Sequence, residues 1–111
     1  MAKLPVSVFI IAKDEADRIG AAINSVIGWV DEVIVIDSGS TDGTQALAEK
    51  LGARVMFNEW HGYGPQKVFG EKQCRNDWLL NIDADEEIGM ELKQSVQKLF
   101  NDAIFPYKAY R

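Results

Sequence analysis

Residues 78–85 read WLLNIDAD, an apolar run that ends in the two carboxylates of Asp83 and Asp85. Short apolar runs bounded by polar residues are typical of strands buried on both faces, as the strands of parallel sheets are. The chain is therefore predicted to contain buried strands, the last of which leads directly into an acidic turn. Three similar runs, rich in β-branched residues, lie at residues 6–11, 33–36 and 55–57.

The first gap between these runs carries a helical pattern. Apolar residues recur there at steps of three and four, so they form one stripe on a helix. Asp14 precedes the pattern and is predicted to cap that helix. The stripe consists of Ile19, Ile23, Val26, Ile27 and Val30.

Three further helices are predicted from their end signals and apolar spacing. Asp42 and Gln45 resemble a capping box for the second helix, and Gly52 is expected to end it. Pro65 suits the first turn of a third helix that runs to about Cys74. The inner face of the second helix is assigned to Leu47 and Leu51, and the fourth helix to Leu92, Val96, Leu99, Phe100 and Ala103.

The alternation of strands and helices decides the fold class. It predicts an α/β fold, a three-layer αβα sandwich with a mostly parallel sheet and right-handed crossovers, formed by residues 1–111 as one domain. Because the strands of such a sheet point the same way, the loops that follow them meet along one edge, where ligands bind. We therefore expect the acids of four loops, at residues 14–15, 37, 59 and 83–87, to lie near one another.

Length, charge and cysteine content restrict the class of protein. The 111 residues suffice for one domain, and 12 basic against 17 acidic residues give a formal charge of -5. An acidic chain is a poor partner for nucleic acid or anionic lipid, but it suits metal cations. The lone Cys74 cannot form an internal disulfide. The apolar stretch near the N-terminus is too short for a signal peptide or a membrane span, so a cytoplasmic protein is expected.

Asp83 and Asp85 are the strongest candidates for a site with chemistry. Two carboxylates that flank a small residue at a strand end can both reach a hard cation, and Mg²⁺ or Mn²⁺ keeps open positions for substrate phosphates. A cation would also relieve the repulsion among carboxylates that share one edge. The alternative interpretation is a solvated acidic turn that caps the fourth helix.

Asp37, at the end of the second strand, is the next candidate. Its carboxylate can accept hydrogen bonds from a nucleobase or from ribose hydroxyls, and Gly39 and Gly43 allow a tight turn there. The alternative is a turn with a helix cap, which is the interpretation preferred for Asp42.

Other polar side chains are weaker candidates. Lys67 and Arg75 are the nearest basic residues for a phosphate, although either can equally belong to a solvated helix face. His61 is interpreted as a loop or core residue rather than a catalyst, and Cys74 as a small buried apolar residue.

Four segments carry a resemblance to a known family. They are VSVFIIAKDE at residues 6–15, VIDSGSTDGT at 35–44, WHGYGPQK at 60–67 and DADE at 83–86. With them the chain resembles the N-terminal, nucleotide-sugar-binding half of family 2 glycosyltransferases, which have the Rossmann-like GT-A fold. The third segment is similar to the branch of β-1,4-glucosyltransferases that act on the lipopolysaccharide inner core.

The resemblance implies roles for residues near the nucleotide. Ala12, Lys13 and Glu15 would line the pocket for base and ribose. Asp37 would contact the uracil or the ribose, and Lys67 would lie near the nucleotide.

The resemblance also implies a metal site and two departures from the family pattern. Asp83 would face the ribose and the metal, and Asp85 would ligate a Mg²⁺ or Mn²⁺ ion directly. Asp14 stands where an asparagine is usual, and Val68 where an asparagine often follows the basic residue.

The implied reaction moves a sugar, with inversion, from a UDP-linked donor to a hydroxyl of a glycan or lipid-linked acceptor in lipopolysaccharide core or another cell-envelope glycan. Family members continue into an acceptor-binding half that supplies the general base. That base is therefore expected beyond residue 111, the chain is expected to be a truncated fragment that is inactive alone, and residues 105–111 look like the start of a further strand. Peripheral association of the full-length protein with the inner face of the cytoplasmic membrane, and a homodimer, are further expectations.

Other classes of protein fit the pattern less well. A receiver-type signalling domain needs a phosphoacceptor aspartate after the third strand, which here leads into Asn58-Glu59. A phosphatase of the haloacid dehalogenase type opens its fold with the acidic motif and continues it with Thr or Val, where Glu87 stands here. A calcium loop that began at Asp83 would need Gly at Ile88 and Glu at Gln94.

Overall fold

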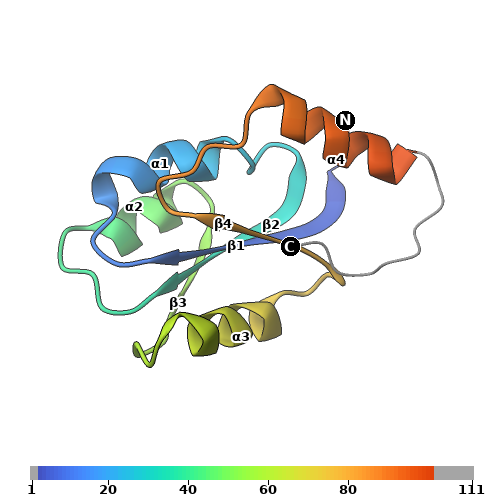
Figure 1. The fold of residues 1–111 in the computed structure, drawn as a ribbon. Coiled ribbons are helices and arrows are strands. Elements are labelled where there is room, and N and C mark those ends of the chain that lie inside the picture. Colours follow the sequence, from blue (N-terminus) through green and yellow to red (C-terminus); the bar gives the residue numbers. More distant parts are fainter. Residues whose placement is uncertain (1–2, 102–111) are drawn as a thin grey trace.

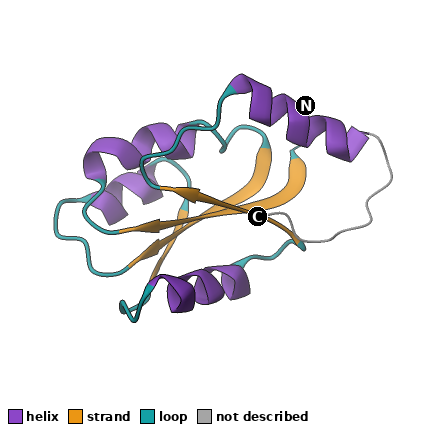
Figure 2. Cartoon of the chain, in the orientation of Figure 1, coloured by secondary structure: helices purple, strands orange, loops and turns teal. Residues whose placement is uncertain are grey.

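Strands and helices alternate along residues 3–101, which the computed structural model describes (Figures 1 and 2). The four predicted apolar runs all lie within strands, so the predicted alternation is confirmed. Ala103 and the strand expected at residues 105–111 lie outside the described residues. The elements are β1 (Leu4–Ala12), α1 (Ala16–Asn24), β2 (Val30–Asp37), α2 (Thr44–Lys50), β3 (Arg54–Phe57), α3 (Tyr63–Gln73), β4 (Trp78–Asp83) and α4 (Met90–Asn101).

The strands of residues 3–101 form one parallel sheet in the order β3-β2-β1-β4. β1 lies between β2 and β4, with Ile10 opposite both Val35 and Ile82. The carboxyl ends of the strands therefore lie at one edge of the sheet, on the left in Figure 1. The predicted α/β class with its parallel sheet is confirmed.

Helices cover both faces of the sheet, and successive residues of β1 pack alternately against the helices on one face and on the other. Val8 and Ile10 belong to the core under α1, α2 and α4, whereas Phe9 belongs to the core under α3 (Figure 1). All three side chains are fully buried, and each such burial stabilises the fold by about 1.5–3 kcal/mol. Burial on both faces explains why the strands read as unbroken apolar runs.

α3 approaches the sheet closely at Gly70. A Cβ atom at this position would lie 2.5 Å from Cδ2 of Phe9, whose ring is fully buried. Because packed side chains do not tolerate such a distance, only glycine fits here without a shift of the helix or the ring. Gly70 therefore fixes how near α3 lies to β1.

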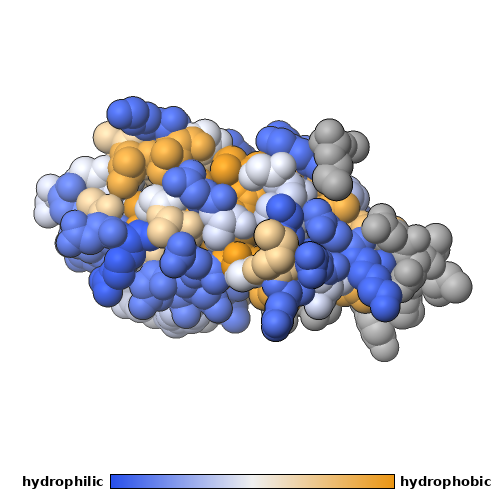
Figure 3. Space-filling model, turned by 90° about the horizontal axis from the view of Figure 1, so that it is seen from above, coloured by the Kyte–Doolittle hydropathy of each residue, from blue (hydrophilic) through white to orange (hydrophobic). Residues whose placement is uncertain are grey.

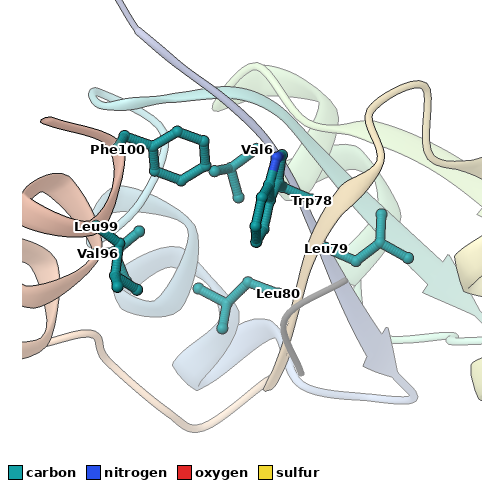
Figure 4. A pocket seen from close by; sticks show the side chains of 7 residues that line it. All are labelled: Val6, Trp78, Leu79, Leu80, Val96, Leu99 and Phe100. Carbon is teal, nitrogen blue, oxygen red and sulfur yellow. The ribbon is translucent and has the colours of Figure 1, made fainter. Parts of the chain in front are cut away.

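α4 packs beside β4 through an apolar contact (Figure 4). The rings of Trp78 and Phe100 meet edge to face, with their centroids 5.3 Å apart. A small cavity of about 20 Å³ remains between helix and strand, and its apolar lining is expected to stay dry. The lining consists of Val6, Trp78, Leu79, Leu80, Val96, Leu99 and Phe100.

The outer side of the face that carries α1 and α4 is mixed in character. Hydrophilic side chains cover much of it, with hydrophobic ones between them (Figure 3). Of the residues predicted to mark α4, Val96 is buried, whereas Leu92 and Leu99 are exposed. Among residues 3–101, no helix combines the length and hydrophobicity that a membrane crossing requires.

The predicted extent of the first helix is wrong at its end. α1 stops at Asn24, so Val26 and Ile27 lie in a turn and Val30 begins β2. The Ser25 hydroxyl donates a hydrogen bond back to the Ala22 carbonyl at 2.7 Å, and such a bond competes with the regular helical pattern. All three apolar residues still join the core, and for that reason they matched the helical stripe.

The predicted C-terminal end of α2 and both predicted ends of α3 are confirmed. α2 stops at Lys50, and Gly52 follows with a φ of 102°, a conformation that glycine adopts without strain. Pro65 lies in the first turn of α3, which ends at Gln73 with Cys74 as its C-cap.

Candidate functional site

The acidic strand ends that were predicted to converge share one rim of the sheet. Asp37 ends β2 opposite Ala12 of β1, and Asp83 ends β4 opposite Ile11. Since β1 lies between the two strands, the two backbones are separated by two strand spacings, roughly 9–10 Å. A single small ligand can therefore span the distance between these positions.

A pocket of about 340 Å³ opens among the loops that follow β1, β2 and β3. Its volume lies in the range of small-molecule sites in proteins. The three residues that the resemblance assigned to a base and ribose pocket line it together, and the half-exposed ring of Trp60 forms a further wall. The lining consists of Ile11, Ala12, Lys13, Glu15, Ser38 and Trp60.

The loop after β1 is held in place by side chains of the loop after β2. Each bond joins positions at least 26 residues apart in the chain, so the pocket wall around Lys13 and Glu15 depends on tertiary structure. Three backbone N–H groups donate across this contact: Asp14 to Ser40 Oγ (2.8 Å), Glu15 to Thr44 Oγ1 (2.9 Å) and Ala16 to Asp42 Oδ2 (3.0 Å).

The cap predicted for α1 is therefore wrong, and the capping box predicted for α2 forms only in part. Asp14 does not cap α1; its backbone has a φ of 52°, and its carboxylate accepts the N–H of Thr41 at 2.8 Å. At α2, Asp42 Oδ1 accepts the N–H of Thr44, the first residue of the helix, at 3.0 Å, but the Gln45 side chain turns to Asp37 and does not complete the capping box. Free N–H groups at the start of a helix need acceptors, and the neighbouring loop supplies them to α1.

Asp37 is fully buried and holds the loop after β2. Its Oδ2 accepts the N–H groups of Gly39 and Ser40 at 2.8 Å and the amide of Gln45 at 2.6 Å, while the Ser40 hydroxyl donates to Oδ1. Burial alone would raise the pKa of Asp37, but these hydrogen bonds outweigh it and hold the pKa below its ordinary value. Four bonds fill the usual acceptor capacity of a carboxylate.

The loop after β3 is fixed by a buried glutamine that the sequence did not single out. Gln66 donates to the Asn58 carbonyl at 3.0 Å and accepts the Asn58 amide at 2.7 Å. Between these anchors, Trp60 projects toward the pocket, and the exposed His61 lies 3.5 Å from a Glu59 carboxylate oxygen. The interpretation of His61 as a loop residue agrees with this position.

Asp83 and Asp85 are both exposed at this rim. The Tyr63 hydroxyl donates a hydrogen bond to Asp83 Oδ1 at 3.0 Å, whereas no hydrogen bond or ion pair within residues 3–101 engages the Asp85 carboxylate. Burial and the neighbouring Asp83 raise the pKa of Tyr63, so its hydroxyl keeps its proton at neutral pH. α4 begins only at Met90, so neither acid caps that helix.

The two acids fit a cation that shares its ligands with a substrate. Within the described part of the chain, no three His, Cys, Asp or Glu side chains are grouped so that they could hold a metal ion by themselves. Mg²⁺ in particular is commonly bound by one or two carboxylates together with substrate phosphates. Asp83 and Asp85 supply a donor set of that kind, with Asp85 open to solvent.

The two basic candidates lie in different places: Lys67 belongs to the first half of α3, and Arg75 follows the C-cap of that helix. Lys67 Nζ lies 6.0 Å from the ring centroid of Tyr63, near the carboxyl edge. Arg75 donates from Nε to Asp31 Oδ2 at 2.7 Å, next to the start of β2. The interpretation of Arg75 as a phosphate partner is therefore wrong, because it lies at the amino edge of the sheet.

The amino edge holds a buried carboxylate that the sequence did not reveal. The Glu32 side chain is only 6% exposed, and it accepts hydrogen bonds from Ser7 Oγ (2.6 Å), Arg75 N (2.7 Å) and Arg54 Nη2 (3.2 Å). Burial opposes ionisation of Glu32, but these donors outweigh it and lower its pKa. Arg54 also donates to the Gln73 carbonyl at 2.6 Å, so this group ties the end of α3 to β2.

Cys74 lies near Glu32 at the amino edge and has a structural role. Its thiol donates to the Gly70 carbonyl at 3.3 Å and packs against the core under α3. Burial raises the pKa of Cys74 to about 11, so the thiol stays protonated and unreactive near neutral pH.

A parallel sheet with a pocket and two exposed carboxylates at its carboxyl edge is typical of α/β domains that bind a ligand at that edge. Comparison with known families is more specific. The model of glycosyl transferase family 2 matches residues 7–104, and the chain belongs to this family. That match decides against the receiver and phosphatase alternatives.

Individual relatives of the chain are also glycosyltransferases by name. A glycosyltransferase of Rickettsia felis is 58% identical over 86% of this chain and 34% of its own length. The lipopolysaccharide core biosynthesis glycosyltransferase LpsC of Rhizobium meliloti is 38% identical over 98% of this chain and 43% of its own length. The chain thus spans about a third and about two fifths of the length of these two relatives.

A solved structure shows the same fold with ligands. Glucosyl-3-phosphoglycerate synthase from Mycobacterium tuberculosis, crystallised with Mn²⁺, UDP and glucosyl-3-phosphoglycerate, superposes with a TM-score of 0.66. It is 30% identical over 74% of this chain and 35% of that chain.

Proposed function

We propose that the carboxyl edge of this domain binds the nucleotide diphosphate sugar of a glycosyl transfer reaction, with a UDP-linked donor. One observation carries the proposal: the pocket among the first three loops opens on the same rim as Asp83 and Asp85. The Mycobacterium tuberculosis synthase of the same fold, which holds Mn²⁺ and UDP, supports it.

We propose a role for each residue of the rim, in agreement with its surroundings. Ala12 offers backbone and little bulk, while Lys13 and Glu15 offer a donor and an acceptor to base and ribose within the pocket. Asp37 acts chiefly by holding its loop, because it is fully buried and accepts four hydrogen bonds from residues of that loop and of α2. Lys67 is the proposed cationic neighbour of the nucleotide.

Asp83 and Asp85 would hold the divalent cation together with the diphosphate. A cation bound there would act as a Lewis acid that stabilises the leaving nucleoside diphosphate. The acceptor oxygen forms its bond to the anomeric carbon as the bond to the diphosphate breaks, with inversion, and the hydroxyl proton passes to a general base. We assign that base to the acceptor-binding part of the whole protein. In the relatives, the residues outside the aligned region would form that part.

The acceptor class is proposed from the relatives. LpsC, which aligns with nearly the whole chain, is named for lipopolysaccharide core biosynthesis. We infer an acceptor hydroxyl on lipopolysaccharide core or a related cell-envelope glycan.

Calorimetric titration of UDP into the 111-residue chain, with and without Mn²⁺, tests the donor site. Mn²⁺ is expected to tighten UDP binding, and Asp85→Ala is expected to remove that gain, because Asp85 is the open carboxylate of the pair. Asp77→Ala is the matched control, since Asp77 is an exposed aspartate just before the opposite end of the same strand. UDP binding that ignores Mn²⁺, or an equal loss in both variants, would contradict the proposal.

A further inference from the structure

We propose that Tyr63 is a positioning residue that orients Asp83 toward the cation and the nucleotide; this inference rests on the proposed function. Tyr63 is the first residue of α3, and its hydroxyl donates to Asp83 Oδ1 at 3.0 Å across the space between helix and strand end. It thus reaches one of the two carboxylates of the rim without belonging to the metal-binding pair.

The bond restricts how the Asp83 carboxylate can turn. Oδ1 is held by the tyrosine, while Oδ2 remains available for a ligand. The backbone of Asp83 is fixed as well, because its N–H donates to Glu86 Oε1 at 3.1 Å and its carbonyl accepts the Glu86 N–H at 3.0 Å. Carboxylates that ligate metals are commonly oriented by such secondary hydrogen bonds.

The Tyr63 ring is itself held on two sides. The Trp60 ring meets it edge to face, with centroids 6.4 Å apart, and Lys67 Nζ lies 6.0 Å from its centroid. Trp60 also lines the nucleotide pocket. One contiguous set of contacts therefore joins the pocket wall to the oriented carboxylate.

A purely structural role for the hydroxyl does not account for this arrangement. Tyr63 is 48% exposed, so its ring contributes little to the core. Removal of the hydroxyl alone leaves the contacts of the ring with Trp60 and Lys67 intact. The effect of Tyr63→Phe should therefore fall on Asp83 and not on the fold.

The test compares UDP affinity with and without Mn²⁺ for the wild-type chain, Tyr63→Phe and Asp85→Ala. Tyr63→Phe is expected to weaken Mn²⁺-dependent UDP binding about tenfold, as loss of a hydrogen bond to a metal ligand commonly does, and to leave metal-free UDP binding and the thermal midpoint unchanged. A structural role would instead lower the midpoint, or weaken binding equally in both conditions, and either result overturns the inference.

The remaining outcomes separate the inference from the proposed function. If Mn²⁺-dependent binding is lost in Asp85→Ala but is wild-type in Tyr63→Phe, only the role of Tyr63 is overturned. If the wild-type chain shows no Mn²⁺-dependent binding, the proposed function fails and the inference fails with it.

Discussion

The two edges of the sheet use the same kinds of residue in opposite ways. At the amino edge, Glu32 is buried and accepts three hydrogen bonds, while the Asp31 carboxylate pairs with Arg75. At the carboxyl edge, Asp83 has one side-chain donor, and Asp85 has none among residues 3–101. The backbones of these edges are roughly 16 Å apart along β2.

Burial decides whether a carboxylate stabilises the fold or remains available to a ligand. A buried carboxylate must receive its donors within the protein, because an unpaired buried charge is strongly destabilising. An exposed carboxylate is stable without a partner because water solvates it, and it can therefore remain free to bind a cation. Glu32 and Asp31 at the amino edge therefore stabilise the protein, as the buried Asp37 does at the carboxyl edge, whereas the exposed Asp83 and Asp85 remain available for binding.

The largest expected effect on stability comes from neutralising the amino edge. Glu32→Gln should lower the free energy of unfolding by about 3 kcal/mol, because it removes a buried charge from three donors that face it. Asp83→Asn, the same isosteric change at the other edge, should alter stability by less than about 0.5 kcal/mol. Urea unfolding of both variants measures the contrast, and equal losses would remove the distinction between the edges.

A smaller effect is expected in α3, which joins the two edges. Gly70→Ala should lower stability by about 1–2 kcal/mol, because the new methyl group meets the buried Phe9 ring. Gly64→Ala in the same helix is the control, since nothing lies within 4 Å of a Cβ there, and it should raise stability by about 0.5 kcal/mol through helix propensity. If Gly70→Ala also stabilises the chain in urea unfolding, the close approach of α3 is not rigid.

The smallest expected effect is a dependence of stability on pH that originates at the amino edge. The Arg75 hydrogen bond lowers the pKa of Asp31 from 3.8 to about 2, and the donors around Glu32 lower its pKa from 4.5. Carboxyl groups with lowered folded pKa values stabilise the protein above their unfolded pKa values, and this contribution disappears as pH falls through the folded ones. Stability should therefore decline from about pH 4.5 to pH 2.

The variant Arg75→Ala tests whether Asp31 is the source of this pH dependence. It removes the main donor to Asp31, so thermal midpoints recorded between pH 5 and pH 2 should fall less steeply than in the wild-type chain. Asp77→Ala serves as the control and should keep the wild-type slope. An unchanged slope in Arg75→Ala would show that Asp31 does not supply this pH dependence.

The sequence predicted the strands and the rim well because these depend on local patterns. Apolar runs mark strands that are buried on both faces, and the parallel topology then places Asp37 and Asp83 at one edge. The predictions that failed depended on partners distant in the chain. Asp14 looked like a cap because the true acceptors for α1, such as Asp42, lie 26 residues further on.

Distant partners also explain why one residue was assigned to the wrong edge and two others were overlooked. Arg75 was placed with Lys67 because both follow the third loop, but α3 carries them to opposite edges of the sheet. Glu32 sits in an apolar strand with no local sign of its three donors. Tyr63 had one available signal, a hydroxyl in a glycine-containing loop beside the predicted binding edge, but only the structure shows its bond to Asp83.

The contact between the first two loops has a consequence for affinity. Because Ser40, Asp42 and Thr44 satisfy the backbone at the start of α1, the pocket walls around Lys13 and Ser38 become ordered when the chain folds, before a ligand arrives. The entropic cost of arranging these walls then belongs to folding and not to binding. The nucleotide would meet a preorganised surface, and substitutions in either loop should change its dissociation rate through the other.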